Sequence, residues 1–277
     1  PRAFLTKPFP FRKGFFIFIY MDITDKLQIG EDYIKNGVLK WLPSDTEEDF
    51  FERLNKDPKN PSLLHYLENP ITYKLNNYGF RTPVNFVDGI EGNVFLGCSH
   101  TIGIGHYLES IWSWKLNEYI GGNFLNLAVG GTGIGTGYRL LYGLKEMIRP
   151  KNVFLYYPHV HRFEYYHARN QKWQTVSAPH NPSKKFLYES NNVEMYYYLH
   201  YNAIKNLCNE LNVPLYTINE FFSLFKQTSA LPRIARDNHL YPATHVNIFE
   251  RFKEVYDNKI EIYSRPVNLL PLTKTIL

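Results

Sequence analysis

The feature that most constrains the fold of this sequence is an alternation, from about residue 84 onward, between short apolar runs and longer stretches with helical spacing. Short apolar runs bounded by turn residues are typical of buried strands, and the helical stretches between them supply crossover connections. Repeated strand-helix-strand units build an α/β domain around a mostly parallel sheet. The pattern predicts strands at 93–97, 124–129, 152–158 and 213–219, and helices at 106–120, 135–148, 191–211 and 242–256.

The chain is predicted to consist of an N-terminal extension (1–83), the α/β domain (84–260) and a C-terminal tail (261–277). In the extension, "DTEEDFFERLNKD" predicts a helix and "NPITYKLNNYGFRTP" an extended, turn-rich approach. Residues 1–20 are rich in Pro and Phe and precede Met21. We set them apart as upstream translation or the remnant of a longer product. The stretch 159–190 is too long for a routine connection, which predicts a functional or lid-like insertion.

Composition narrows the functional classes. The 31 basic and 26 acidic residues are scattered rather than gathered in a stripe, which argues against nucleic-acid binding. The longest apolar run, "GFFIFIYM" at 14–21, is too short to span a bilayer, so no membrane anchor is predicted. Cys98 and Cys208 are the only cysteines and belong to no paired motif. A reducing, cytoplasmic compartment without a disulfide framework is therefore expected.

The end of the first predicted strand carries a candidate nucleophile. Ligands gather at the carboxyl ends of parallel strands, and "GCSHT" follows directly there. Gly97 permits a tight turn, and Ser99 would lie at the mouth of the next helix, where its backbone N–H and the helix dipole favour developing negative charge. A single serine in this position is more often a helix cap or turn residue, so both roles stay open at this point. Cys98 is predicted to be a small buried residue because adjacent residues in a turn point apart.

The end of the second strand is rich in glycine. In "NLAVGGTGIGTG", four glycines alternate from Gly131, which suggests backbone N–H groups exposed to a ligand. The dinucleotide pattern G-x-G-x-x-G fails because Thr136 and Tyr138 stand where its third glycine is needed, and no P-loop ending follows. The alternatives are an oxyanion-binding turn, which fits better, and a flexible helix entry.

A candidate base lies near the C-terminus, in "ARDNHLYPATHVNIFERF" at 235–252. Asp237 and His239 are two residues apart just before a predicted helix, a spacing that lets a carboxylate orient an imidazole toward a nucleophile. His245 competes as the base, but it lies inside the predicted helix. We therefore prefer His239.

These blocks resemble a known family. "FLGCSHTIGIG" is similar to the first block of SGNH (GDSL-type) hydrolases, in the form where Cys replaces Asp before the nucleophile. "NLAVGG" resembles the second block, "DNHLYPATH" the last, and "YKLNNYGFRTP" the approach segment, over about residues 72–256. The resemblance implies a flavodoxin-like, three-layer α/β/α sandwich. It also implies that Ser99 is the nucleophile, His239 the general base and acid and Asp237 its orienter, with the amides of Ser99 and Gly131 in the oxyanion hole.

The chain departs from this family after the third strand. Family members have a Gly-x-Asn-Asp block there, whereas this sequence has "HVHR" and no Asn. The third oxyanion donor is therefore replaced by His159, His161 or Arg162, or it is missing. Losing one such donor lowers the rate roughly a hundredfold, about 3 kcal/mol.

His159 and His161 could instead share a zinc ion with His167 or His180, but nothing in the sequence fixes a complete ligand set. No metal or other cofactor is therefore predicted. Arg162 and His180 are assigned to the polar wall of the substrate cleft.

The sequence predicts a serine esterase or acyltransferase acting on a small acyl ester. An O-acetylated carbohydrate suits the His-rich insertion and the 17% aromatic content better than a long lipid tail. The alternatives are a catalytically degenerate carbohydrate-binding protein and a metal-dependent hydrolase built on His159 and His161.

Overall fold

A four-stranded parallel sheet forms the centre of the molecule. The computed structural model describes residues 37–41, 47–156, 158, 160, 162–167, 169, 172–177, 190–218 and 242–259. The strands are β3 (Ile90–Leu96), β4 (Phe124–Asn126), β5 (Ile148–Tyr156) and β8 (Leu215–Ile218). They lie in the order β4-β3-β5-β8, and each neighbouring pair is parallel. The predicted α/β class, with its parallel sheet, is therefore confirmed.

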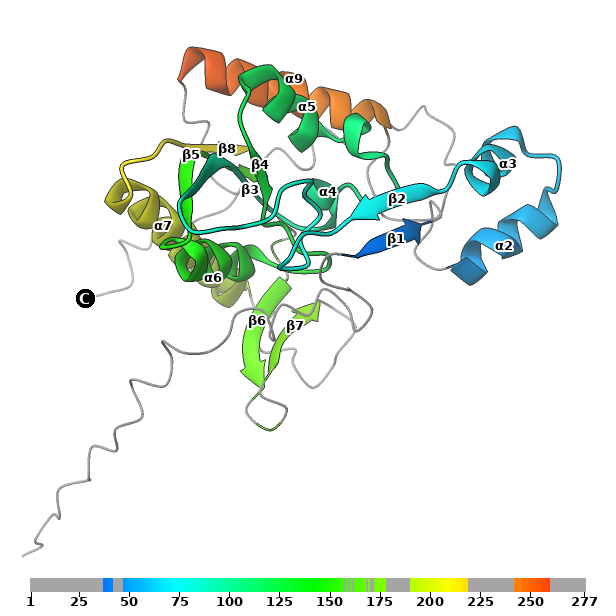
Figure 1. Cartoon of the computed structure of the whole chain (residues 1–277). Coiled ribbons are helices and arrows are strands. Elements are labelled where there is room, and N and C mark those ends of the chain that lie inside the picture. The colour runs from blue at the N-terminus through cyan, green and yellow to red at the C-terminus, as the bar shows by residue number, and fades with distance from the viewer. Residues whose placement is uncertain are drawn as a thin grey trace, which may run out of the picture.

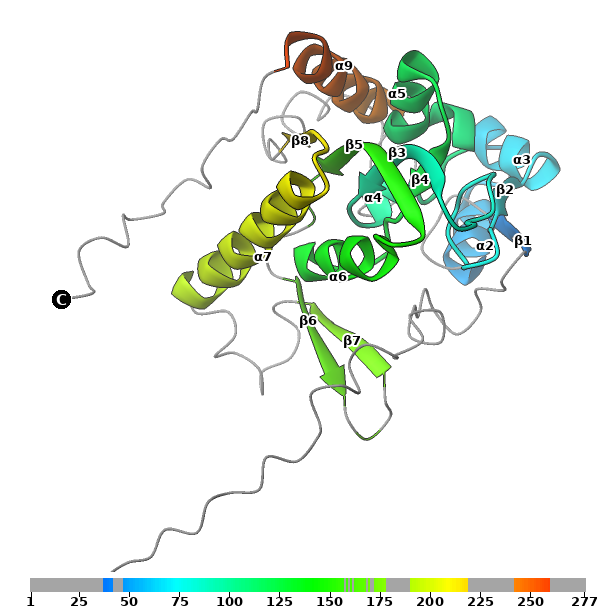
Figure 2. The same cartoon turned by 60° about the vertical axis from the view of Figure 1, so that its left-hand side comes forward.

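Helices cover both faces of this sheet (Figures 1 and 2). The pairs are α6 (Ile134–Leu144) with α7 (Ser190–Glu210) on one face, and α5 (Trp112–Ile120) with α9 (Pro242–Asn258) on the other. Strand β3 shows why: Val94 and Leu96 join the apolar cluster under α6 and α7, whereas Phe95 between them packs with α5 and α9. Successive side chains of a strand point to opposite faces, so both faces of β3 are buried. No helix in the described ranges is both long and apolar enough to cross a bilayer.

Several element ends differ from the predicted ones: β3 begins at Ile90, β4 ends at Asn126 and α6 ends at Leu144, each three or four residues from the expected position. The helix expected over 106–120 begins only at Trp112, after a short 3₁₀ turn, Leu108–Ser110. Strand β5 begins at Ile148, four residues earlier than expected, and takes up Pro150 opposite a register shift between Gly92 and Asn93. A proline lacks the donor for a regular ladder, and an irregularity in the pairing is where strands tolerate it.

The described part of the N-terminal extension contains an antiparallel pair, β1 (Val38–Trp41) with β2 (Ile71–Lys74), and two helices. The helices are α2 (Glu47–Lys56), which confirms the predicted one, and α3 (Pro61–Glu68). An apolar cluster joins β2 to the loops that follow β3 and β4; its buried members are Ile71, Tyr73, Leu75, Ile102, Ile104 and Ala128. The extension therefore packs directly against the edge of the sheet at which β3 and β4 end. Residues 1–20 and 261–277 lie outside the described ranges.

The long stretch 159–190 contains an antiparallel hairpin of β6 (Arg162–His167) and β7 (Lys172–Ser177). It lies below α6 in both Figure 1 and Figure 2, away from the extension. A lid-like role for this insertion stays a prediction.

Candidate active site

Ser99 lies at a sharp turn immediately after β3. It is the first residue of α4, a single helical turn (Ser99–Ile102), and the residue is 5% exposed. Gly97 has φ +155°, and a Cβ atom there would lie 2.0 Å from Thr101 Oγ1 and 3.0 Å from the carbonyl oxygen of Tyr156. Only glycine lets the chain turn this closely against the end of β5.

The carbonyl groups of this turn are occupied. Every carbonyl from Cys98 to Gly103 accepts at least one hydrogen bond. Two of the donors come from α5: Trp112 Nε1 donates to the carbonyl of His100 at 3.2 Å, and Ser113 Oγ donates to that of Thr101 at 3.0 Å. The turn is thus fixed through its acceptors.

The hydrogen-bond donors of Ser99, its amide and its hydroxyl, differ from these carbonyl groups. Within the described part of the chain, neither its amide nor its hydroxyl donates a hydrogen bond. Buried donors are normally paired. An uncommitted amide and hydroxyl on a nearly buried residue are what a nucleophile and its oxyanion donor require.

The glycine-rich turn after β4 lies beside the Ser99 turn. The amide of Val129 donates to the carbonyl of Gly97 at 3.3 Å, which joins the two turns. Gly131 has φ +73° and is exposed, and a Cβ atom built on it would meet no atom within 4 Å. The Cβ position of Gly131 therefore borders open space at the same edge of the sheet as Ser99, and its amide donates no hydrogen bond among the described residues.

The glycines that follow serve close packing. A Cβ atom on Gly133 would lie 2.1 Å from the carbonyl oxygen of Arg162, and one on Gly135 would lie 2.2 Å from the Tyr196 hydroxyl. The expectation that all the alternating glycines face a ligand is therefore wrong for these two. They let the β6–β7 hairpin and α7 approach the start of α6.

Helix α9 contacts the same region through His245. The residue is fully buried, its Nδ1 accepts a hydrogen bond from the amide of Trp112 at 3.2 Å, and its ring contacts that of His106 edge-on at 4.5 Å between centroids. This hydrogen bond assigns the ring proton to Nε2 and occupies the Nδ1 lone pair. In this tautomer, neither ring nitrogen can accept the Ser99 proton, which argues against His245 as the base.

Three further predictions concern Cys98, Arg162 and His167. Cys98 is 1% exposed, which confirms that it is buried. Arg162 begins β6, and its Nη1 is buried without a hydrogen bond to any described residue. His167 ends β6, and in the described ranges no three His, Cys, Asp or Glu side chains form a group that could hold a metal ion. The other predicted site residues lie outside the described ranges: His159, His161, His180, Asp237 and His239.

Nothing in the sequence indicated that Tyr156, the last residue of β5, lies beside the candidate site. Burial raises the pKa of its hydroxyl, and the neighbouring Cys98 raises it further. The hydroxyl is buried and has no hydrogen-bond partner in the described part of the chain. It therefore stays protonated beside the turn that carries Ser99.

Comparisons with known proteins add no assignment: no protein-family model matches the chain, and a search of curated proteins gives no significant match.

Proposed function

We propose that the protein is a serine esterase or acyltransferase of the SGNH type, with Ser99 as its nucleophile. The observation that carries the proposal is the hydrogen bond between Val129 and Gly97, because it joins the turn of Ser99 to the turn of Gly131. The uncommitted amide of Ser99 and the exposed Gly131 thus belong to adjoining turns at one edge of the sheet. Two such amides can hold the oxyanion of a tetrahedral intermediate.

The strand order supports the flavodoxin-like part of the proposal. Numbered along the chain, the four parallel strands lie in the order 2-1-3-4, which is the beginning of the flavodoxin-like order. The chain runs from β3 to its neighbour β4 on one side and then crosses back to β5 on the other side of β3, so the strand order reverses at β3. Ligands of such sheets bind at this switch point, outside the carboxyl ends of the strands. Ser99 follows β3 there.

In the proposed reaction, His239 takes the proton of Ser99 Oγ while Oγ attacks the acyl carbon. The tetrahedral intermediate collapses, and the leaving alcohol takes the proton from the His239 imidazolium, which Asp237 keeps oriented. Water, or an acceptor alcohol, then removes the acyl group by the same steps in reverse.

The position of α9 is compatible with this assignment of the base. His245, in the first turn of α9, bonds to Trp112, which in turn bonds to the carbonyl next to Ser99. His239 precedes Pro242 by three residues, a length of chain that spans at most about 11 Å. As the third oxyanion donor we favour Arg162, because its Nη1 is buried and unpaired among the described residues. The proposed substrate is a small acyl ester, with an O-acetylated carbohydrate as the leading class.

The test is labelling of the purified protein with a fluorophosphonate, which reacts with activated serines, followed by mapping of the modified peptide. We expect one adduct, on Ser99, and none in Ser99→Ala or His239→Ala. Ser110→Ala is the matched control, because the Ser110 hydroxyl bonds only locally, to the carbonyl of Tyr107. Hydrolysis of p-nitrophenyl acetate should follow the same pattern. Absence of an adduct on wild-type Ser99 would contradict the proposed mechanism and favour a degenerate, binding-only protein.

A further inference from the structure

The turn that carries Ser99 cannot hold its own shape. Helix α4 is a single turn, and Gly103 and Gly105 behind it have φ +75° and +80°. One helical turn is unstable in isolation because nucleation fixes several residues for very few hydrogen bonds. The shape of this segment therefore depends on contacts from other parts of the chain.

Arg81, from the N-terminal extension, supplies the most concentrated of these contacts. It is 4% exposed, and its Nη1 donates to the carbonyls of Ile102 and Gly103 at 2.9 and 2.7 Å. Its Nη2 donates to the carbonyl of His106 at 2.7 Å. One planar guanidinium thus fixes the last carbonyl of α4 and two carbonyls of the loop behind it, with the strength of charge-assisted hydrogen bonds.

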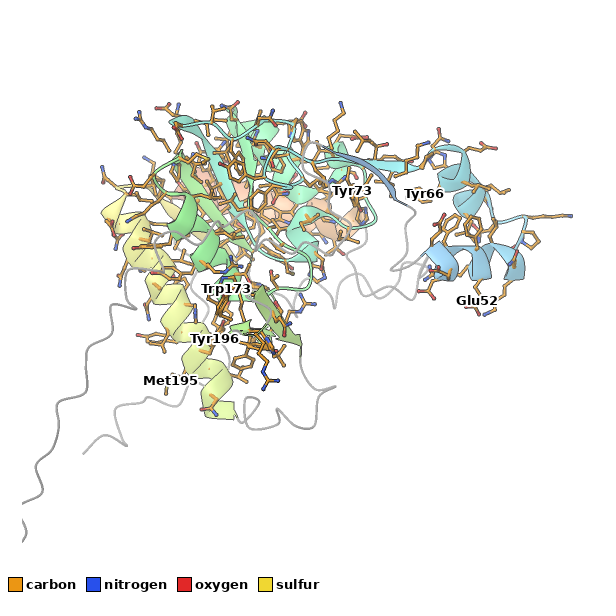
Figure 3. The ribbon with its side chains drawn as sticks, turned by 60° about the horizontal axis from the view of Figure 1, so that its bottom comes forward. Glu52, Tyr66, Tyr73, Trp173, Met195 and Tyr196 are labelled. Carbon is orange, nitrogen blue, oxygen red and sulfur yellow. The ribbon has the colours of Figure 1, made fainter. Side chains whose placement is uncertain are left out.

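Tyr73, on β2, holds the guanidinium and the loop together. The Arg81 guanidinium carbon lies 3.9 Å from the centroid of the Tyr73 ring, and the Tyr73 hydroxyl accepts a hydrogen bond from the amide of Gly105 at 2.8 Å. Figure 3 shows Tyr73 where the extension meets the α/β domain, with Tyr66 and Glu52 farther out. Both residues belong to the extension, yet both bind the loop behind Ser99.

The loop is connected directly to the nucleophile. The carbonyl of Ser99 accepts hydrogen bonds from the amides of Gly103 and Ile104, at 2.9 and 3.1 Å. Arg81 binds the carbonyl of Gly103, so a single residue separates the guanidinium contact from the peptide unit of Ser99. A shift of the loop would therefore move the peptide unit of Ser99 and, with it, the Ser99 hydroxyl and amide.

We propose that Arg81, supported by Tyr73, is a positioning residue for the acyl transfer at Ser99. The inference rests on the proposed function, but it assigns a role that the sequence analysis does not give to either residue. It makes the extension a working part of the active site. Neither side chain is assigned a contact with substrate, so its loss should lower kcat and leave KM nearly unchanged.

The experiment compares Arg81→Ala, Arg81→Lys and Tyr73→Phe in the full chain, with p-nitrophenyl acetate and the fluorophosphonate as probes. Lysine keeps the charge but not the planar fork. We expect kcat to fall about a hundredfold in Arg81→Ala, about tenfold in Arg81→Lys and severalfold in Tyr73→Phe, because misplacement by about 1 Å costs rates of this size. Millimolar guanidinium chloride should restore part of the Arg81→Ala rate, and sodium chloride should not.

The matched control is Tyr107→Phe, which removes a hydroxyl that donates to the carbonyl of Asn69 and not to this loop. It should keep kcat within about twofold of wild type, in line with the small effect of an exposed hydrogen bond. Circular dichroism verifies folding, and if Arg81→Ala does not fold, the other two variants decide. Folded Arg81→Lys and Tyr73→Phe with wild-type labelling rates would overturn this inference alone. A wild-type protein that the fluorophosphonate leaves unlabelled at Ser99 would overturn it together with the proposed function.

Discussion

The N-terminal extension and the β6–β7 hairpin both pack beside the candidate site, but they use opposite kinds of contact. The extension is held by backbone acceptors: Arg81 binds three carbonyls, and the Thr82 hydroxyl donates to the carbonyl of Phe124. The strongest polar attachment of the hairpin is a carboxylate: Glu164 bonds to Arg139 through both oxygens, at 2.6 and 2.9 Å, and accepts a hydrogen bond from Thr136 at 2.8 Å.

The difference has a physical consequence. Carbonyl groups cannot be removed by a side-chain substitution or neutralised by acid, so the extension keeps its acceptors under all ordinary conditions. The hairpin depends on a charge pair whose side chains are only 5% and 16% exposed, and burial makes such a pair expensive to break. The extension is therefore anchored through a side-chain donor on neutral backbone acceptors, whereas the hairpin is anchored through a buried pair of opposite charges.

The largest effect is expected from Glu164→Gln. It leaves the Arg139 guanidinium buried without its counter-charge, which should lower the free energy of unfolding by about 3 kcal/mol in urea titrations. Glu210→Gln breaks the exposed pair with Lys145 and is the control, with an expected loss below about 0.5 kcal/mol. The double variant Arg139→Met with Glu164→Met should recover most of the loss. Equal losses in Glu164→Gln and Glu210→Gln would show that the buried charge pair holds the hairpin no more strongly than an exposed pair would.

The next effect concerns the close approach of the hairpin to the glycine-rich turn. A Cβ atom in Gly133→Ala would collide with the carbonyl of Arg162, a backbone atom that can move only with the strand. We expect a loss of about 2 kcal/mol in the same titrations, typical of overpacking. Gly130→Ala places its methyl group in open space and should change stability by less than about 0.5 kcal/mol. A neutral Gly133→Ala would show that the hairpin packs against this turn only loosely.

A smaller effect is expected on the extension side. Tyr73→Phe leaves the amide of Gly105 without its acceptor, which should cost about 1 kcal/mol and loosen the loop behind Ser99. The measurement is the rate at which Cys98, the residue before Ser99, is alkylated at pH 8. A looser loop should expose Cys98 more often, so this rate should rise about fivefold. Burial raises the pKa of Cys208 to about 12, so that residue stays a thiol at this pH and contributes little.

Glu164→Gln should leave the Cys98 rate unchanged, because the two attachments act on different turns. Faster alkylation of Cys98 in Glu164→Gln would show that hairpin and extension are coupled.

Much of the fold follows from local pattern, and what does not follow depends on distant partners. The periodicity of apolar residues predicted the four parallel strands. It did not predict the start of β5, because a proline such as Pro150 is accepted within a strand only next to an irregularity in the pairing with β3, which the sequence does not reveal. The positions of the motifs after two predicted strands also predicted that Ser99 and Gly131 lie at the same edge of the sheet. Arg81 was missed as a site residue because its partners are backbone carbonyls more than twenty positions away, which leave no mark in side-chain patterns. The only signal was its place in the approach segment "YKLNNYGFRTP".

The smallest effect tests whether the hairpin is held by charge alone. The guanidinium carbon of Arg139 lies 4.8 Å from the centroid of the Trp173 ring on β7. Tyr196 of α7 accepts a hydrogen bond from the amide of Glu164 in the same hairpin. Trp173→Phe keeps an aromatic ring but weakens the cation–π attraction, which should cost about 0.5 kcal/mol. In an Arg139→Met background the same substitution should cost less, because the cation is gone. An equal loss in both backgrounds would mean that apolar packing of the ring, rather than its attraction to Arg139, helps to hold the hairpin.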